Sequence, residues 1–99
     1  MTTQPIRAIG MVWYSLEDFG EIKTMMEDGH KLHRTYSEWR IAAEHGERQM
    51  RRQGHLVVRA HLLPDEFREY CRRHGLKLDA QGRNHFANWV AYQAHGTDH

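Results

Sequence analysis

A strand that leads directly into a helix is the feature that most constrains how this chain can fold. It occupies residues 55–74, where apolar side chains first alternate, from Leu56 to Leu62, and then recur at helical spacing. Pro64 fits the first turn of a helix, where its missing N–H breaks no hydrogen bond, and Gly75 fits the residue just after a helix end. The stretch therefore predicts a strand with one buried face, joined to an amphipathic helix.

Similar signals predict one more strand and three more helices. Residues 6–14 are rich in β-favouring side chains and are apolar on both faces. Ser15, Thr35 and Asp79 each fit the N-cap of a helix, because their side-chain oxygens can accept backbone N–H groups of the first turn. The three expected helices end near Gly29, Gln53 and His95.

The expected fold is a single α+β domain over residues 1–99, in which the order strand–helix–helix occurs twice. Two antiparallel helices between the strands would return the chain so that the strands run antiparallel to one another. A two-stranded sheet alone is marginal, and a strand that is apolar on both faces needs cover on both. We therefore expect a small antiparallel sheet packed against four helices, with two strands per chain and four in an edge-to-edge homodimer.

Composition argues against several classes of protein. The formal net charge of +1 gives no overall signature of nucleic-acid or membrane binding. The single cysteine cannot form an intramolecular disulfide and suits a reducing, cytoplasmic environment. No stretch is long and apolar enough to predict a transmembrane helix. The eight glycines are scattered singly, so no phosphate-binding loop and no cofactor are predicted.

The best candidate for a binding surface is the polar face of the second strand. Arg59 and His61 share this face, and the end of the first strand could place Trp13 and Tyr14 beside them. Arginine and aromatic side chains together are typical anchors of protein interfaces. If helices cover only one face of the sheet, this polar face is open or is closed by a partner. The alternative is a structural role, in which Arg59 pairs with a carboxylate of a helix.

A metal site is only weakly indicated, although the chain has nine histidines. Cys71 and His74 are three residues apart on a predicted helix, a spacing that could share a metal ion. A zinc site requires three or four convergent ligands, and the sequence offers only pairs.

An arginine patch gives the alternative of nucleic-acid binding. Arg48, Arg51 and Arg52 fall on one side of the long second helix. Glu44 and Glu47 precede Arg48 and Arg51 by four residues, so the pattern also fits a solvated helix face with favourable ion pairs.

No catalytic residue is predicted. Cys71 could act as a nucleophile with His74 or His61 as its base, but it lies on the apolar stripe of its helix beside Phe67. The sequence therefore predicts a small cytoplasmic protein-binding or adaptor module that acts as a homodimer. The alternatives are a nucleic-acid-binding regulator that uses the arginine patch and a metal-binding protein that uses Cys71 and His74.

Overall fold

The computed structural model describes residues 8–96, which contain each of the expected strands and helices. In chain order the elements are β1 (Ala8–Trp13), α1 (Leu16–Met25), the 3₁₀ turn η1 (Gly29–Lys31), α2 (Tyr36–Arg52), β2 (Leu56–His61), α3 (Pro64–His74), α4 (Ala80–Ala91) and the π-helical turn η2 (Tyr92–Gly96). The first helix ends earlier than expected, and the last helix changes to π geometry in its final turn. Residues 6 and 7 of the first expected strand lie outside the described range.

The predicted starts of the helices and the predicted end of α3 are confirmed. Ser15, Thr35 and Asp79 are the N-caps of α1, α2 and α4, and each side chain accepts a backbone N–H from three residues further on. Pro64 occupies the first turn of α3, and Gly75 ends that helix in the left-handed conformation, with φ of 65°. Local side-chain chemistry therefore sets where these helices begin and where α3 ends.

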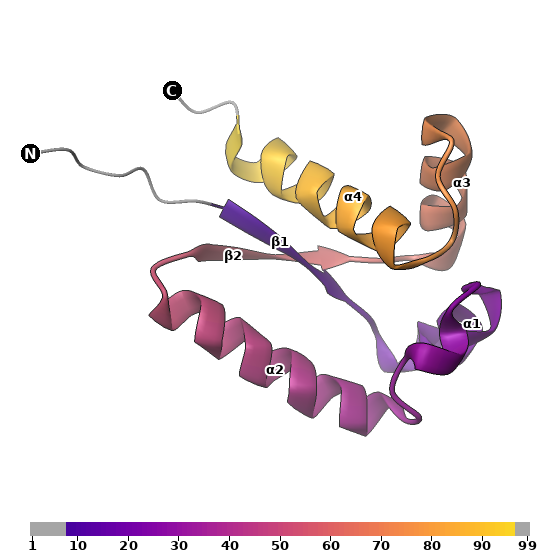
Figure 1. The fold of residues 1–99 in the computed structure, drawn as a ribbon, viewed down its shortest axis with the longest axis horizontal. Helices are drawn as coiled ribbons and strands as arrows, with labels where there is room; N and C mark the ends of the chain where they lie inside the picture. Colours follow the sequence, from indigo (N-terminus) through magenta and orange to yellow (C-terminus); the bar gives the residue numbers. More distant parts are fainter. Residues whose placement is uncertain (1–7, 97–99) are drawn as a thin grey trace, which may run out of the picture.

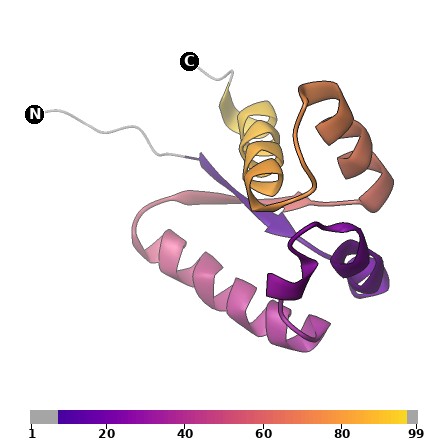
Figure 2. The same cartoon turned by 45° about the vertical axis from the view of Figure 1, so that its right-hand side comes forward.

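The two strands pair in parallel, with Ala8 opposite Leu56 and Trp13 opposite His61. Helix α4 covers one face of this sheet and α2 covers the other, whereas α1 and α3 lie beyond the end at which both strands finish (Figures 1 and 2). The molecule is thus layered as helix, sheet and helix, with two shorter helices grouped at the carboxyl ends of the strands.

The expected antiparallel sheet is wrong, and the position of α1 explains why. Because α1 lies beyond the strand ends, only α2 runs back along the sheet (Figure 1). Its 17 residues span about 25 Å, which exceeds the roughly 20 Å of a six-residue strand. Helix α2 alone therefore returns the chain to the end where β1 began, and β2 starts in the same direction.

The reason given for an edge-to-edge dimer is also absent from the structure. The second face of β1 is covered by α2. Met11 of β1 points toward this helix, and its methyl carbon lies close to Gly46. The two halves of the chain differ as well, since α2 has 17 residues and α4 has 12, and a 3₁₀ turn separates only the first pair of helices within residues 8–96. The structure supports an α+β fold with four helices, but it supports neither a repeat nor a dimer.

The core has aromatic clusters on both sides of the sheet. On the α2 side, Trp13 and Trp39 meet edge to face with ring centres 5.2 Å apart. On the α4 side, Phe67 and Phe86 meet in the same way at 5.7 Å. The largest completely buried side chains are those of Phe67, Ile22 and Leu62. Within residues 8–96, no helix is long and apolar enough to cross a membrane.

Helix α4 approaches β1 so closely that the contact admits no side chain at Gly10. A Cβ atom placed on Gly10 would lie 1.8 Å from the carbonyl oxygen of Ala87 and 2.4 Å from its carbonyl carbon. Both atoms belong to the helix backbone, so the clash cannot be relieved by rotating a side chain. Gly10 is therefore a packing requirement of this fold rather than a flexible point.

We predict that Gly10→Ala destabilises the protein by about 3 kcal/mol, because α4 has to move off the sheet to admit the methyl group. Urea unfolding followed by circular dichroism would measure the change. Gly20→Ala is the matched control, since Gly20 is exposed in α1 with open space around its Cβ position. Alanine there should stabilise the helix by roughly 0.5–1 kcal/mol. Equal stabilities for Gly10→Ala and the wild type would contradict the close contact.

Candidate functional site

A hollow of about 400 Å³ opens at the carboxyl ends of the two strands. The chain leaves β1 toward the layer that contains α2 and leaves β2 toward the layer that contains α4 (Figure 1). Neighbouring parallel strands whose connections go to opposite faces leave a crevice at their carboxyl ends, which is where open α/β sheets bind ligands. We call this site the strand-end hollow; its lining residues are Trp13, Tyr14, Ser15, Leu16, Glu17, Tyr36, Arg40, Arg59 and His61.

The four residues predicted for binding all line this hollow. Trp13 and His61 are register partners on the last rung of the sheet, and Tyr14 follows Trp13. Trp13 and Tyr14 are buried among the core aromatics, whereas His61 is exposed. The structure thus brings the predicted side chains to one place, with Arg59 and His61 as its accessible polar members.

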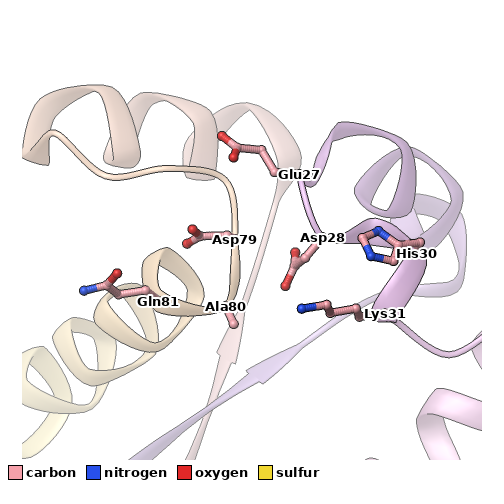
Figure 3. A pocket seen from close by; sticks show the side chains of 7 residues that line it. All are labelled: Glu27, Asp28, His30, Lys31, Asp79, Ala80 and Gln81. Atoms are coloured by element: carbon pink, nitrogen blue, oxygen red, sulfur yellow. The ribbon is translucent and has the colours of Figure 1, made fainter.

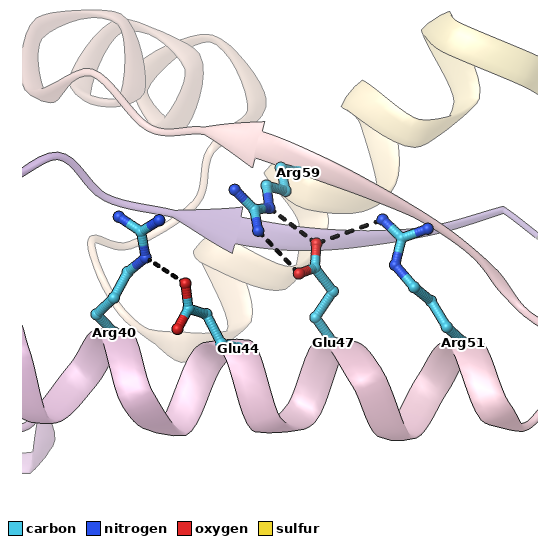
Figure 4. Close-up of polar contacts among 5 residues, drawn as sticks. All are labelled: Arg40, Glu44, Glu47, Arg51 and Arg59. Carbon is cyan, nitrogen blue, oxygen red and sulfur yellow. Dashed lines mark hydrogen bonds and ion pairs between the residues drawn. The ribbon is translucent and has the colours of Figure 1, made fainter.

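Arg59 is held by one aromatic ring and one carboxylate. Its guanidinium carbon lies 3.8 Å from the ring centre of Trp13, within cation–π range. Its Nε and Nη2 atoms each donate a hydrogen bond of 2.8 Å to the carboxylate of Glu47 on α2 (Figure 4). This two-point geometry gives Arg59 a defined orientation at the floor of the hollow.

The position of Glu47 corrects two expectations. Helix α2 covers the polar face of β2 as far as the strand-end hollow, so only the end of this face at the hollow is accessible, and Arg59 has the structural pairing that was the alternative. Glu47 was expected on the solvated face of α2, yet it is only 7% exposed. Hydrogen bonds from Arg59 hold the pKa of Glu47 below its ordinary value, against the opposing effect of burial. The Arg51 guanidinium adds a longer contact of 3.5 Å.

A second arginine, Arg40, flanks the same tryptophan and was missed from the sequence. Its guanidinium carbon is 5.5 Å from the Trp13 ring centre. Its Nε donates to Glu44 at 3.0 Å, and its Nη1 donates to the hydroxyl of Tyr36 at 3.0 Å. The signal that could have identified Arg40 is the spacing of four residues on either side of it, which aligns Tyr36, Arg40 and Glu44 along one helix face.

Both arginines retain N–H groups for a ligand. Each guanidinium uses two of its nitrogens in the bonds described above, and it carries further N–H donors. Among residues 8–96, no acceptor is bonded to the remaining nitrogen of either Arg40 or Arg59. The positive end of the α1 dipole also faces this region, since Ser15 and Leu16 line the hollow. These features suit an anionic group, and the opposing carboxylate at the rim belongs to Glu17.

The weak metal and catalytic candidates have structural surroundings. Cys71 is buried, its thiol lies 3.6 Å from the carbonyl oxygen of Lys77, and burial raises its pKa, which disfavours the reactive thiolate. His74 is exposed and stacks on Tyr70 with ring centres 4.2 Å apart. No group of three potential metal ligands occurs in the described part of the chain.

The arginine patch lies at the other end of α2. Arg48, Arg51 and Arg52 are all exposed near the carboxyl end of the helix, and Arg51 contacts Glu47. The expected pair between Glu44 and Arg48 is replaced by the pair between Glu44 and Arg40. Nucleic-acid binding by this patch stays a prediction.

Three acidic side chains line a second, polar hollow (Figure 3). Two of them have structural roles, and the third points away from the other two. Asp28 accepts two hydrogen bonds from Arg83, at 2.8 and 2.9 Å, and both side chains are largely buried. Asp79 caps α4, and Glu27 is directed away from them (Figure 3). Asp28 and Arg83 therefore connect the end of α1 to α4 across 55 residues of sequence.

Comparison with known proteins gives no relative: no family model, no curated protein and no solved structure matches the chain.

We predict that Asp28→Asn destabilises the protein by about 2 kcal/mol at neutral pH, because it leaves the Arg83 charge buried without a counter-ion. The hydrogen bond from Arg83 lowers the pKa of Asp28 in the folded state, so Asp28 binds a proton more readily in the unfolded state than in the folded state. The contribution of Asp28 to the free energy of unfolding is therefore complete above the pKa of Asp28 in the unfolded state, which is near 4. This contribution is lost as the pH falls through the lower pKa of Asp28 in the folded state.

Urea unfolding at several pH values between neutral and acidic would measure this effect. The wild type should lose stability on acidification more steeply than Asp28→Asn. Asp65→Asn is the control, since Asp65 is paired with Arg68 at 2.8 Å but is 97% exposed; we expect a change of about 0.5 kcal/mol or less. Parallel pH profiles for the wild type and Asp28→Asn would contradict the role given to this pair.

Proposed function

We propose that this chain is a small protein-binding module that receives a carboxylate-bearing segment of a partner protein in the strand-end hollow. The observation that carries the proposal is the pair of guanidinium groups on Trp13. Arg40 and Arg59 are oriented by Glu44 and Glu47, and both keep nitrogens that bond to no described acceptor. Orientation before binding favours affinity, since less side-chain freedom is lost when a ligand arrives.

An acidic segment fits the other groups around the hollow. A carboxylate can accept hydrogen bonds from both arginines, and arginine forks match carboxylate geometry. His61 is exposed at the rim and offers a further polar contact. Leu16 is also at the rim and is 66% exposed, so an apolar contact is available beside the charged ones. Exposed apolar side chains next to arginine are typical of protein interfaces.

The test is an NMR titration of the ¹⁵N-labelled protein with acetylated glutamate hexapeptide, compared with the glutamine hexapeptide. We expect saturable shifts at Arg40, Arg59, His61 and the start of α1 with the glutamate peptide only. Arg40→Gln should weaken binding about fivefold, because it removes a charge-assisted contact. Glu17→Gln should strengthen it, because it removes a like charge from the rim.

Arg48→Gln is the matched control, since it removes an exposed arginine from the same helix but outside the hollow. Its affinity for the glutamate peptide should equal that of the wild type at fixed salt. Equal binding of the two peptides, or an equal loss of affinity in Arg40→Gln and Arg48→Gln, would show that the hollow does not recognise carboxylates.

We also propose that two copies of the chain associate through a strand edge. The proposed location is the cytoplasm, because a chain with a single cysteine suits a reducing compartment. The support is the size of the sheet: within residues 8–96 it has two strands, so each strand has one edge without a strand neighbour. Such edges carry backbone groups that another chain can pair with. Leu56, at the start of β2, is 39% exposed.

Sedimentation velocity over a range of concentrations tests this association. We expect a dimer for the wild type and a shift to monomer in Leu56→Lys, because a lysine on an edge strand opposes pairing between chains. Leu63→Lys is the control, since Leu63 is similarly exposed but lies outside the strands. A wild type that stays monomeric at high micromolar concentration would refute the dimer while leaving the carboxylate site unaffected.

A further inference from the structure

A third and larger hollow lies between α3 and α4. Its volume is about 760 Å³, within the range of ligand-binding pockets. We call it the α3–α4 groove; it is lined by Asp65, Glu66, Glu69, Tyr70, Arg73, His74, Phe86 and Trp89. It shares no lining residue with the strand-end hollow, so its chemistry can be considered independently of the function proposed above.

Aromatic rings form one wall of the α3–α4 groove. Tyr70 is central: its ring centre lies 5.3 Å from that of Phe86 and 5.4 Å from that of Trp89. The hydroxyl of Tyr70 lies 2.6 Å from Nδ1 of His85 on α4, a hydrogen bond that fixes the ring against this helix. Trp89 is 44% exposed, so a large part of its indole is accessible although the ring is packed against its neighbours. A rigid and accessible tryptophan is a good surface for a ligand.

One carboxylate of the groove has no cationic partner. Asp65, Glu66 and Glu69 line the groove together with the guanidinium of Arg73. Asp65 pairs with Arg68, and Glu69 pairs with both Arg72 and Arg73, so the charges of these two carboxylates are already matched. Glu66 makes no ion pair with any residue of the described range 8–96. The groove therefore combines an accessible aromatic surface with the unmatched negative charge of Glu66.

We propose that the α3–α4 groove binds a lysine or arginine side chain presented by a segment of a partner protein. An aromatic face attracts a cation through its quadrupole, and tryptophan does so most strongly. The aliphatic stem of the same side chain would cover apolar ring surface, while its charged end meets Glu66. An acidic ligand would be repelled by Glu66, and an uncharged apolar one would leave Glu66 without a counter-charge.

The test uses a defined basic probe, the acetylated and amidated peptide Gly-Lys repeated three times, with the corresponding Gly-Gln peptide as its match. The ¹⁵N-labelled protein is titrated at low salt and at one fixed pH. We expect a saturable shift of the Trp89 indole N–H with the lysine peptide. Trp89→Leu should weaken binding about fivefold, as followed through the backbone amides of α3.

Glu66→Gln should weaken binding about threefold, and this loss should shrink as salt is added. Two controls match these variants. Tyr92→Leu removes an exposed aromatic ring one turn beyond Trp89, and Glu38→Gln removes an exposed carboxylate on α2; both lie outside the groove. Both controls should bind as the wild type does.

Three results would overturn the inference. The first is an absence of saturable shifts with the lysine peptide. The second is equal binding of the lysine and glutamine peptides, which would mean that the groove recognises no charge. The third is an equal loss of affinity in Glu66→Gln and Glu38→Gln, which would mean that the attraction is diffuse. Thermal unfolding of each variant establishes that the fold is intact, and none of these results bears on carboxylate binding at the strand-end hollow.

Discussion

The contact between Gly10 and the backbone of Ala87 is the constraint on which the arrangement of this chain depends. With no side chain between them, α4 lies directly against β1 and closes one face of the sheet. That position brings Arg83 of α4 to Asp28, and the ion pair then ties the turn after α1 to the opposite layer. A small sheet gains stability when both of its faces are covered. In this chain, the close packing of α4 on β1 buries apolar surface that further strands would bury in a larger sheet.

Charge is organised in a similar way on the other face of the sheet. Glu47 is a buried acid that depends on its ion pair with Arg59. Without this partner, the buried carboxylate would strongly favour the unfolded state. The pair serves the fold by giving the buried carboxylate of Glu47 a counter-charge. It also leaves a guanidinium in a defined orientation at the surface, beside a second arginine on the same tryptophan. A structural ion pair and a prepared binding group are therefore the same set of atoms.

Much of this architecture could be predicted from the sequence, and the failures have physical reasons. Caps, proline and glycine act locally, so the starts of the helices and the identity of both strands followed from a few residues such as Ser15 and Gly75. Strand direction depends on where α1 settles in space, which no local signal reports. Arg59 and His61 could be grouped because strand alternation is regular. The parallel register that puts Trp13 beside His61 was not predicted, and Arg40 comes from a helix whose orientation toward the strands was unknown. The groove between α3 and α4 combines residues from two helices and was invisible for the same reason.

The register of the sheet has a consequence for how the chain is made. Ala8 pairs with Leu56, so β1 can meet its partner strand only after α1 and α2 have been synthesised. Helix α4, which covers one face of β1, is synthesised later still. Pairing of distant segments requires the closure of a long loop. The entropy of this loop is lost before any contact between the segments stabilises the chain, and this slows folding. During translation this face of β1 therefore stays uncovered until α4 has been made, whereas α1 and α2 can form around β1 earlier.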